Sequence, residues 1–367
     1  MGRRPNIEKL EKKRDLARLV AALESDDDGV AEAATAALGR LGTVEATSAL
    51  LGASAHGRPE VRVAAVRALA TSDGMRIVGR LVGMAQADGD ESVQQEAIAA
   101  LRAIGTWEAI DALAELSTAT SNGAQAQEPA RRVLLDLGST AVPHVVARLD
   151  EGRDQATTAA LLLGRIGDPA GVDGLTRAVS RGPADPDACV AALSTIGSDP
   201  AIDALIGLLD RGDEHLSRSA ALGLAGHASE PRVIDALVRG VSAPAVATRE
   251  AAVVGLAGVG DGVVVETLRG ALRDPAPDVQ QEAADALIGR GYRGSDLVDT
   301  LIAQVRVDSS WPGLARAAEL LGIIGDVRAL DPLNRMLDKF DDIDFLARDA
   351  ARTAIRRIKD TAGNGGT

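Results

Sequence analysis

The sequence predicts an all-α superhelical solenoid, a stack of about eleven helix pairs, and three observations lead to this prediction. A helical pattern returns about every 31 residues along the 367-residue chain. Alanine and leucine recur four residues apart within it, which places them on one face of a helix. Aromatic residues make up only 1 % of the chain, so Ala, Leu, Val and Gly must fill the core. Small side chains of this kind favour thin layers that pack closely.

The repeat is clearest in two similar strings, QQEAIAALRAIG ending at Gly105 and QQEAADALIGRG ending at Gly291. A fixed period of about 20–50 residues is typical of repeat arrays. In the register of these strings, eleven units begin at Val30, Val61, Val93, Ala126, Gln155, Asp185, Leu216, Thr248, Val279, Gly313 and Ala347.

Three positions of each unit have a predicted structural role. A small residue at the fifth position lets a neighbouring helix approach, and a large aliphatic residue at the ninth fills the remaining space. The fifth residues are Ala34, Ala65, Ala97, Ala130, Ala159, Cys189, Ala220, Ala252, Ala283, Ala317 and Ala351. The ninth residues are Leu38, Leu69, Leu101, Leu134, Leu163, Leu193, Leu224, Leu256, Leu287, Leu321 and Ile355. The closing residue, predicted to end the helix in a left-handed conformation, is glycine at Gly42, Gly105, Gly138, Gly167, Gly197, Gly260, Gly291 and Gly325.

A second helical pattern lies between these segments. Its apolar residues fall at i, i+3 and i+7, as in Val172, Leu175 and Val179, and it ends in polar turns such as LDRGDE. Each unit is therefore predicted to hold two antiparallel helices, called here the A helix and, for the Ala/Leu segment, the B helix. One pair cannot bury its own apolar faces, so neighbouring pairs must stack.

The domain organisation follows from the repeat. Residues 1–15 are expected to form a polar N-terminal cap, 16–360 the solenoid of about eleven repeats, and 361–367 a flexible tail. The low-complexity stretch 117–129 is expected to be a loop that bulges from one edge.

Three of the five aromatic residues, Trp311, Phe340 and Phe345, fall in the last two repeats. They indicate either a better-filled C-terminal core or a patch that binds a partner.

Composition excludes several classes of function. The formal net charge is −13, which disfavours binding to nucleic acids and to anionic membranes. The single cysteine, Cys189, allows no internal disulfide, and no apolar run is long enough to span a membrane. The charged first residues contain no apolar signal core, so a cytoplasmic location is expected. The acidic, lysine-poor composition is typical of proteins from salt-loving archaea or GC-rich bacteria.

The segments ESVQQEAIAALRAIGTWEAIDALAEL and APDVQQEAADALIGRG resemble HEAT repeats, specifically the short type of phycobilisome-lyase-like proteins. The opening RPNIEKLEKKRDLARLVAAL is similar to the leader of many prokaryotic members, and the resemblance covers residues 5–360. It implies an α-solenoid. Members of this broad family include scaffolds, adaptors, chromophore-handling proteins and metal-dependent hydroxylases, so the resemblance alone does not select a function.

The enzymatic members set requirements that this sequence does not meet. Hydroxylases acting on deoxyhypusine need His-Glu dipeptides as iron ligands, and none of His56, His144, His215 and His227 is followed by glutamate. A bilin lyase would need an aromatic-lined cleft, and five scattered aromatics offer little. Cys189 takes the small-residue position held elsewhere by alanine, which favours a buried, unreactive thiol. We therefore expect no catalytic residue, metal or cofactor.

The remaining candidate site is a surface. In this repeat type the B helices line the concave face, and the third residue of each unit is expected to point there. The candidate partner-binding residues are Glu32, Gln95, Glu128, Asp187, Arg218, Glu250, Gln281 and Asp349. They form either a solvated helix face or an acidic groove that binds a basic segment of a partner.

The sequence thus favours a non-enzymatic scaffold or adaptor that binds partner proteins. An enzyme or maturation factor related to bilin lyases or deoxyhypusine hydroxylases, and a self-assembling structural spacer, remain as alternatives.

Overall fold

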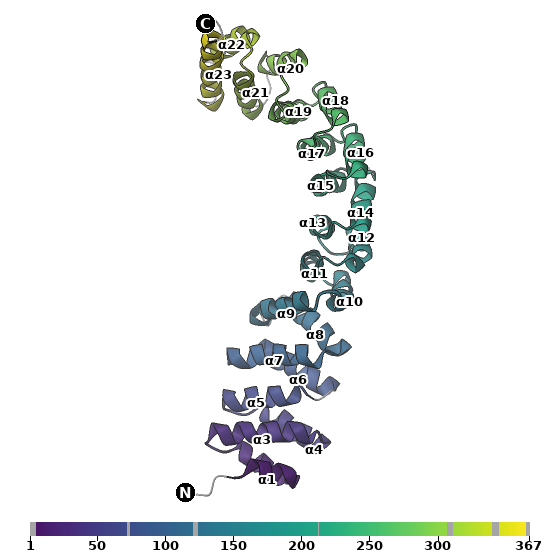
Figure 1. Ribbon diagram of the computed structural model, residues 1–367, viewed down its shortest axis with the longest axis vertical. Coiled ribbons are helices and arrows are strands. Elements are labelled where there is room, and N and C mark those ends of the chain that lie inside the picture. The colour runs from purple at the N-terminus through teal and green to yellow at the C-terminus, as the bar shows by residue number, and fades with distance from the viewer. Residues whose placement is uncertain are drawn as a thin grey trace. The chain divides into compact units, whose positions relative to one another are not determined.

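The computed structural model of the chain describes residues 5–71, 74–119, 124–211, 213–306, 311–339 and 345–364 (Figure 1). All regular secondary structure in these ranges is helical, which confirms the predicted all-α solenoid. A short helix, α1 (Ile7–Lys12), precedes eleven helix pairs, α2/α3 to α22/α23. Asn6 caps α1, because its side-chain oxygen accepts a hydrogen bond of 2.9 Å from the Lys9 amide.

The chain divides into two compact units, Met1–Ile196 and Gly197–Thr367. The helices of the first unit after α1 are α2 (Leu16–Leu23), α3 (Asp28–Leu41), α4 (Val44–Ala53), α5 (Pro59–Leu69), α6 (Met75–Ala87), α7 (Glu91–Ile104), α8 (Trp107–Thr118), α9 (Ala124–Leu137), α10 (Val142–Ala147), α11 (Arg153–Ile166), α12 (Val172–Arg181) and α13 (Pro186–Ile196). The helices of the second unit are α14 (Asp199–Leu209), α15 (Glu214–Ala225), α16 (Pro231–Gly240), α17 (Val246–Leu256), α18 (Gly262–Ala271), α19 (Pro277–Gly289), α20 (Ser295–Arg306), α21 (Trp311–Ile324), α22 (Leu330–Lys339) and α23 (Phe345–Asn364). Short 3₁₀ turns lead into or extend some A helices, at Gly138–Ala141, Arg148–Asp150, Pro169–Gly171 and Val327–Ala329.

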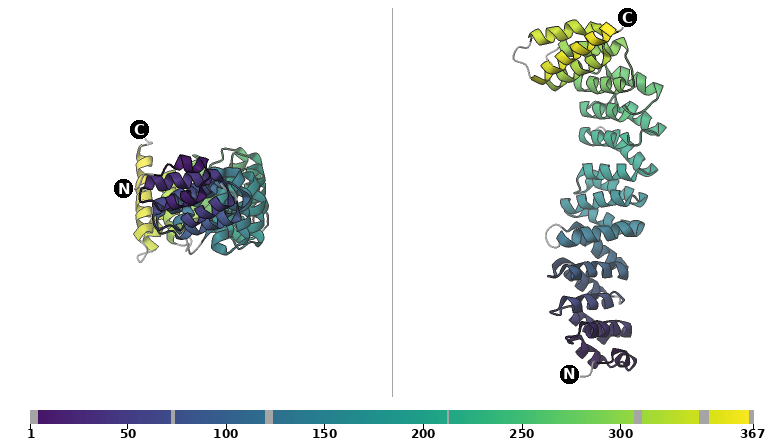
Figure 2. Two further views of the ribbon diagram at one scale, coloured as in Figure 1. Left: turned by 90° about the horizontal axis from the view of Figure 1, so that it is seen from below. Right: turned by 60° about the vertical axis from the view of Figure 1, so that its left-hand side comes forward.

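Within each unit the pairs stack in two layers (Figures 1 and 2). From α2 onward the even-numbered helices are the A helices and form one layer. The odd-numbered helices are the B helices and form the other, called here the B layer; α1 packs against α3 at its N-terminal end. Successive B helices contact one another directly, as α3 contacts α5 and α15 contacts α17.

The core lies between the two layers and along each stack of B helices. All eleven fifth-position residues have 0 % exposure, from Ala34 to Ala351 and including Cys189. Ten of the ninth-position leucines have at most 1 % exposure, and Ile355 in the last repeat has 9 %. The predicted register is therefore confirmed in every repeat.

The closing glycines behave as predicted in seven repeats, with φ from 56° at Gly138 to 79° at Gly325. The prediction is wrong at Gly260, because α17 already ends at Leu256. The guanidinium of Arg290, the residue that follows α19, donates hydrogen bonds to the carbonyl oxygens of Leu256 at 2.6 Å, Ala257 at 2.8 Å and Val259. The carbonyl oxygens at the C-terminal end of α17 thus accept hydrogen bonds from a side chain of the next repeat. In other repeats a left-handed glycine helps to satisfy such carbonyl oxygens.

The expected loop at 117–129 is also corrected, because α8 runs to Thr118 and α9 begins at Ala124. The hydroxyls of Ser117 and Thr118 donate to the carbonyl oxygen of Ala114, which lets both polar residues stay in a buried helical turn. Residues 120–123 lie outside the described ranges.

Two expectations for the C-terminal end change as well. Helix α23 continues to Asn364, so the tail expected from residue 361 is helical over its first four residues, and residues 365–367 lie outside the described ranges. Phe345 is 78 % exposed and does not fill the core. Phe340 and the side chain of Trp311 lie outside the described parts of the chain.

Candidate functional site

The eight sequence-predicted site residues all lie on B helices. Glu32, Gln95, Glu128, Asp187, Arg218 and Asp349 are exposed, whereas Glu250 and Gln281 are half-buried. The first four belong to the first unit and the other four to the second. Each is therefore accessible on the surface of the B layer, and its use by a partner stays a prediction.

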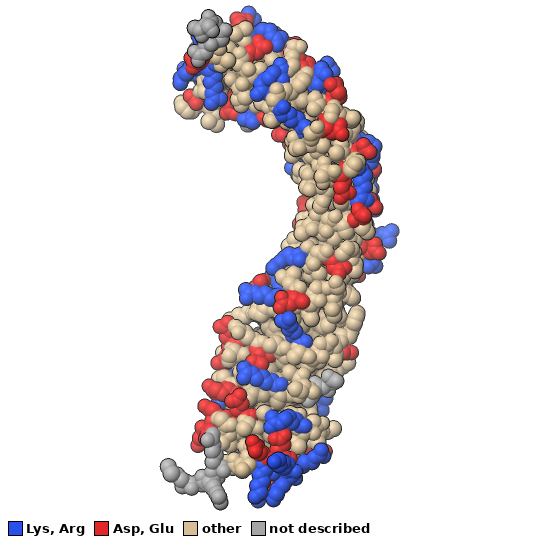
Figure 3. Space-filling model, in the orientation of Figure 1, with Lys and Arg blue, Asp and Glu red and all other residues tan. Residues whose placement is uncertain are grey.

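In the first unit, arginines of the B layer pair with carboxylates of the adjacent repeat. Arg67 of α5 lies 2.9 Å from Glu96 of α7, and Arg102 of α7 lies 3.0 Å from Asp136 of α9. Glu128 itself lies near Arg132 at 3.6 Å. Acidic and basic side chains are interspersed along this surface (Figure 3). These exposed pairs contribute little stability, and of the acidic residues predicted to bind a partner they include only Glu128.

The second unit has a hollow around α19 whose charged lining is two carboxyls and two guanidiniums. This hollow of about 950 Å³ is lined by residues of α17, α18, α19 and α21 and of the turns after α17 and α19, among them Glu282, Asp285, Arg290 and Arg316. We call it the acidic hollow. Arg316 pairs with Asp285, with 2.5 Å between Nη2 and Oδ1, and also lies 2.9 Å from Glu319.

Glu282 is the least compensated carboxyl of the acidic hollow. Burial raises its pKa above the ordinary value, and the neighbouring carboxylates of Asp285 and Glu250 raise it further. Arg316 acts in the opposite direction but is already engaged with Asp285. Sequence analysis singled out Glu250 and missed Glu282, because only the fold shows that the two carboxyls on α17 and α19 act on each other.

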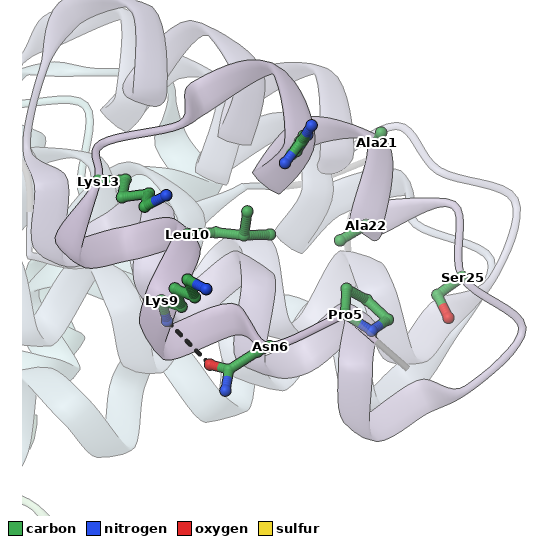
Figure 4. A pocket seen from close by; sticks show the side chains of 9 residues that line it. Pro5, Asn6, Lys9, Leu10, Lys13, Ala21, Ala22 and Ser25 are labelled. Atoms are coloured by element: carbon green, nitrogen blue, oxygen red, sulfur yellow. Dashed lines mark hydrogen bonds between the residues drawn. The ribbon is translucent and has the colours of Figure 1, made fainter. Parts of the chain in front are cut away.

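A second cavity lies between α1, which belongs to the predicted polar cap, and α2, the first helix of the predicted solenoid (Figure 4). It has a volume of about 780 Å³. The apolar part of its lining is Pro5, Leu10, Ala21 and Ala22, and the polar part is Asn6, Lys9, Lys13, Arg18 and Ser25. We call it the N-terminal cleft. Sequence reasoning missed it, although three of the five lysines of the chain lie within residues 9–13.

Cys189 and His144 are buried side chains. Cys189 is fully buried, and burial, together with Asp185, raises the pKa of its thiol to about 11. His144 is 2 % exposed and packs against Trp107 in a tilted arrangement, with ring centroids 4.0 Å apart and 46° between the ring planes. The described residues include no group of three or more His, Cys, Asp or Glu side chains placed to hold a metal ion. Among the described helices, none has both the length and the apolar character needed to cross a membrane.

Comparison with solved structures shows the same fold in larger solenoids. The karyopherin Kap121p bound to the SUMO protease Ulp1p is 13 % identical, with 98 % of this chain and 47 % of Kap121p covered and a TM-score of 0.54. Kap121p bound to the extreme C-terminus of the protein phosphatase Cdc14p is also 13 % identical, with 96 % and 47 % covered and a TM-score of 0.53. The chain therefore spans about half the length of Kap121p.

An engineered protein is 22 % identical over 94 % of this chain and 99 % of its own, but with a TM-score of only 0.36. Among curated proteins, none matches the sequence. The family model for HEAT repeats matches residues 52–134, 216–288 and 265–356. Because these matches cover more than half of the sequence, the chain belongs to the HEAT-repeat family.

Proposed function

We propose that the chain is a non-enzymatic scaffold or adaptor that binds a partner protein through its B layer, with a basic segment of the partner in the acidic hollow. The observation that carries this proposal is the uncompensated charge at Glu282. Burial and neighbouring carboxylates raise the pKa of this side chain, and Arg316, which acts in the opposite direction, is paired with Asp285. The Arg290 guanidinium of the same hollow donates its hydrogen bonds to backbone carbonyl oxygens. A lysine or arginine of a partner would relieve this repulsion, so binding there stabilises both molecules.

The net charge of −13 supports the same choice of partner. Complementary charge speeds association and disfavours acidic competitors, whereas the affinity itself depends on a few well-packed side chains. The acidic hollow offers charged groups and apolar contacts together, because apolar Val254 and Ala286 line it beside the carboxylates of Glu282 and Asp285.

The family supports a binding role in general terms. Stacked helix pairs present a long surface to which side chains from many repeats contribute. Kap121p, which shares the fold, is bound to the SUMO protease Ulp1p in one structure and to a C-terminal segment of Cdc14p in another. We extend to this chain only the idea of a protein partner, and we assign it to the short, phycobilisome-lyase-like type of repeat.

Site-specific photocrosslinking tests the proposal. A photoreactive amino acid replaces Gln281, which lies in the B layer beside Glu282, or Asp235, which is exposed on α16 in the A layer. We expect the probe at position 281, but not at 235, to capture lysine- or arginine-rich segments from native lysate. The double variant Glu250→Gln and Glu282→Gln, which keeps the side-chain shapes, should abolish the capture. Equal capture at both positions, or captured segments without basic residues, would contradict the proposal.

The non-enzymatic part of the proposal has a separate test. Metal analysis and a visible absorption spectrum of the protein purified from its native host should show neither stoichiometric iron nor a bound chromophore. Either finding would favour an activity related to the hydroxylases or bilin lyases instead.

A further inference from the structure

The first A helix of the stack lacks a neighbour that A helices have elsewhere in the first unit. His144 of α10 is 2 % exposed and packs against Trp107 of the preceding A helix, α8. Gly174 holds the same place in α12, and a Cβ there would lie 2.8 Å from a side-chain carbon of Val146 in α10. The equivalent residue of α2, also two positions after the first apolar residue of the A pattern, is Arg18, whose side chain is 76 % exposed. Within the described residues, only the short α1 precedes α2, so no A helix covers this face.

The N-terminal cleft lies at this uncovered face. Its lining includes Ala21 and Ala22 of α2 and Leu10 of α1. Figure 4 shows the Leu10 side chain pointing from α1 toward Ala22, and both residues are buried, whereas Ala21 is exposed. We call these three residues the apolar floor. Alanine side chains let a neighbouring helix approach closely, so the apolar floor suits the packing of another helix.

All charged groups that line the cleft are cations, namely Lys9, Lys13 and Arg18, and its lining contains no carboxyl group. We call these three residues the basic rim. Lys9 and Lys13 lie four residues apart and therefore share one face of α1. Lys and Arg side chains gather at this end of the molecule (Figure 3). The basic rim is thus a local concentration of positive charge in a chain whose net charge is −13.

The carboxylates nearby compensate this charge only in part. Glu8 and Glu11 belong to α1, but the helical spacing turns both away from the face that lines the cleft. Glu11 is moreover held by the Arg40 guanidinium of α3, with both hydrogen bonds at 2.8 Å. Asp15 lies 3.6 Å from Arg18, and it also accepts a hydrogen bond from the backbone amide at the start of α2. The cleft therefore favours an anionic occupant.

We propose that the N-terminal cleft binds an acidic amphipathic helix of a partner protein, which takes the position of the missing A helix. Apolar side chains of this helix pack on the apolar floor, and glutamates or aspartates beside its apolar stripe approach the basic rim. A second copy of this chain, bound through the same face, does not fit, because the two basic rims would repel each other. The site lies in the first unit and does not depend on the acidic hollow of the second.

The chemistry of the cleft sets the character of this interaction. The apolar floor consists of only three residues, so the buried area is small and the affinity modest. The three cations are at the surface, where screening acts over about 8 Å at physiological ionic strength. Binding should therefore weaken as salt rises, and a basic helix should be rejected.

Fluorescence anisotropy with the full chain and a labelled model peptide tests the proposal. The peptide has about 18 residues, or five helical turns, with leucine at i, i+3, i+4 and i+7 and glutamate beside this stripe. We expect it to bind wild type and to lose roughly tenfold or more in affinity for the variant Lys9→Glu with Lys13→Glu. The control variant, Arg76→Glu with Arg153→Glu, changes the net charge equally at two exposed arginines of the same unit and should bind the peptide as wild type does.

Two further measurements separate the apolar floor and the helical shape from charge alone. Ala21→Glu places a carboxylate on the exposed part of the apolar floor and should weaken binding by a similar factor. A peptide of the same charge with two central prolines cannot form a continuous helix and should bind roughly tenfold or more weakly. Circular dichroism melts verify that all variants of the chain fold.

Several outcomes would overturn the proposal. These are no binding of the helical peptide up to about 1 mM, equal loss of affinity in the rim and control variants, and equal binding of the proline-containing peptide. Displacement of the peptide by tripolyphosphate, together with an Ala21→Glu variant that binds as wild type does, would identify a small-anion site instead. None of these results bears on crosslinking at Gln281, so the two proposals can fail separately.

Discussion

Single residues set how closely the B helices pack. The tenth position is glycine in three repeats, and each of these glycines faces an alanine of the next B helix. A Cβ added at Gly39 would lie 3.0 Å from the Cβ of Ala68, and one at Gly164 would lie 2.9 Å from the Cα of Ala192. At Gly322 the corresponding distance to the Cα of Ala354 is 2.7 Å. Backbone cannot yield as a flexible side chain can, so these glycines are required for the approach of neighbouring helices.

Replacing Gly164 by Ala should therefore destabilise the first unit. Overpacking typically costs about 1–3 kcal/mol, which exceeds or cancels the gain of about 1 kcal/mol in helix propensity. The control is Gly83→Ala in α6, where a Cβ would meet nothing within 4 Å. This control should raise the free energy of unfolding by about 0.4–1 kcal/mol. Urea denaturation measures both, and a Gly164→Ala variant as stable as the control would disprove the close packing.

Glu282 provides a prediction about pH. Its pKa is raised in the fold, so the folded chain holds this proton more tightly than the unfolded chain does. The group therefore favours folding at low pH, and this contribution is lost as pH rises through the folded pKa. Glu282→Gln should be more stable than wild type at neutral pH, and the difference should shrink as pH falls toward about 4, the ordinary pKa of glutamate. Thermal melts at the two pH values test this, and an equal or lower melting temperature at neutral pH would contradict it.

One arrangement of side chains between helices occurs twice, and in each case it connects one repeat to the following repeat. Arg249 of α17 pairs with Asp274, which follows α18, at 2.7 Å, and donates to the carbonyl oxygens of Ala243 and Pro244. Gln280 of α19 donates to the Asp274 carbonyl oxygen at 2.6 Å. The same bonds recur in the first unit, where Arg62, Asp88 and Gln94 occupy equivalent positions. Both strings beginning QQEA therefore follow an Arg-Asp pair that connects two B helices through the intervening turns.

Breaking this pair should cost far more than breaking an exposed one. Arg249 and Asp274 side chains are only 10 % and 8 % exposed, so Arg249→Met leaves a buried carboxylate without its partner. The expected loss is about 3–5 kcal/mol. The control Arg239→Met removes the partner of Asp210 in a pair whose side chains are 54 % and 50 % exposed, and should cost less than about 1 kcal/mol. Equal losses in urea denaturation would show that burial does not set the cost here.

The same pair sets an acid dependence of stability. Burial by itself raises the pKa of Asp274, but hydrogen bonds from Arg249 and the Ala276 amide outweigh it and leave the pKa below its ordinary value. This stabilisation is present above the unfolded pKa of about 3.9 and is lost as pH falls through the folded pKa. Arg249→Met should weaken or reverse this dependence. Its free energy of unfolding should therefore fall less steeply than that of wild type below about pH 4.

For the whole molecule, the repeat architecture predicts that a destabilising substitution affects mainly its own repeat and the neighbouring repeats. Each helix pair contacts mainly its neighbours, and the two units have separate sets of internal contacts. Hydrogen exchange of Gly164→Ala should accordingly be faster in α11 and α13 and unchanged in α17 and α19. Faster exchange throughout both units would show that the chain unfolds as a single cooperative body.

The sequence by itself determined the helix pairs, their register and the core, because these depend on a local pattern of residues that recurs in each repeat. The Ala at position five and Leu at position nine were predictable from spacing alone. The structure alone decided how charges combine between repeats. Glu250 acts on Glu282 and Arg290 closes α17, because stacking brings together side chains about 30 residues apart. Lys9 and Lys13 border a cleft because α1 and α2 pack against each other. A one-dimensional period cannot show such contacts, since they depend on helix rotation and side-chain conformation in two different repeats.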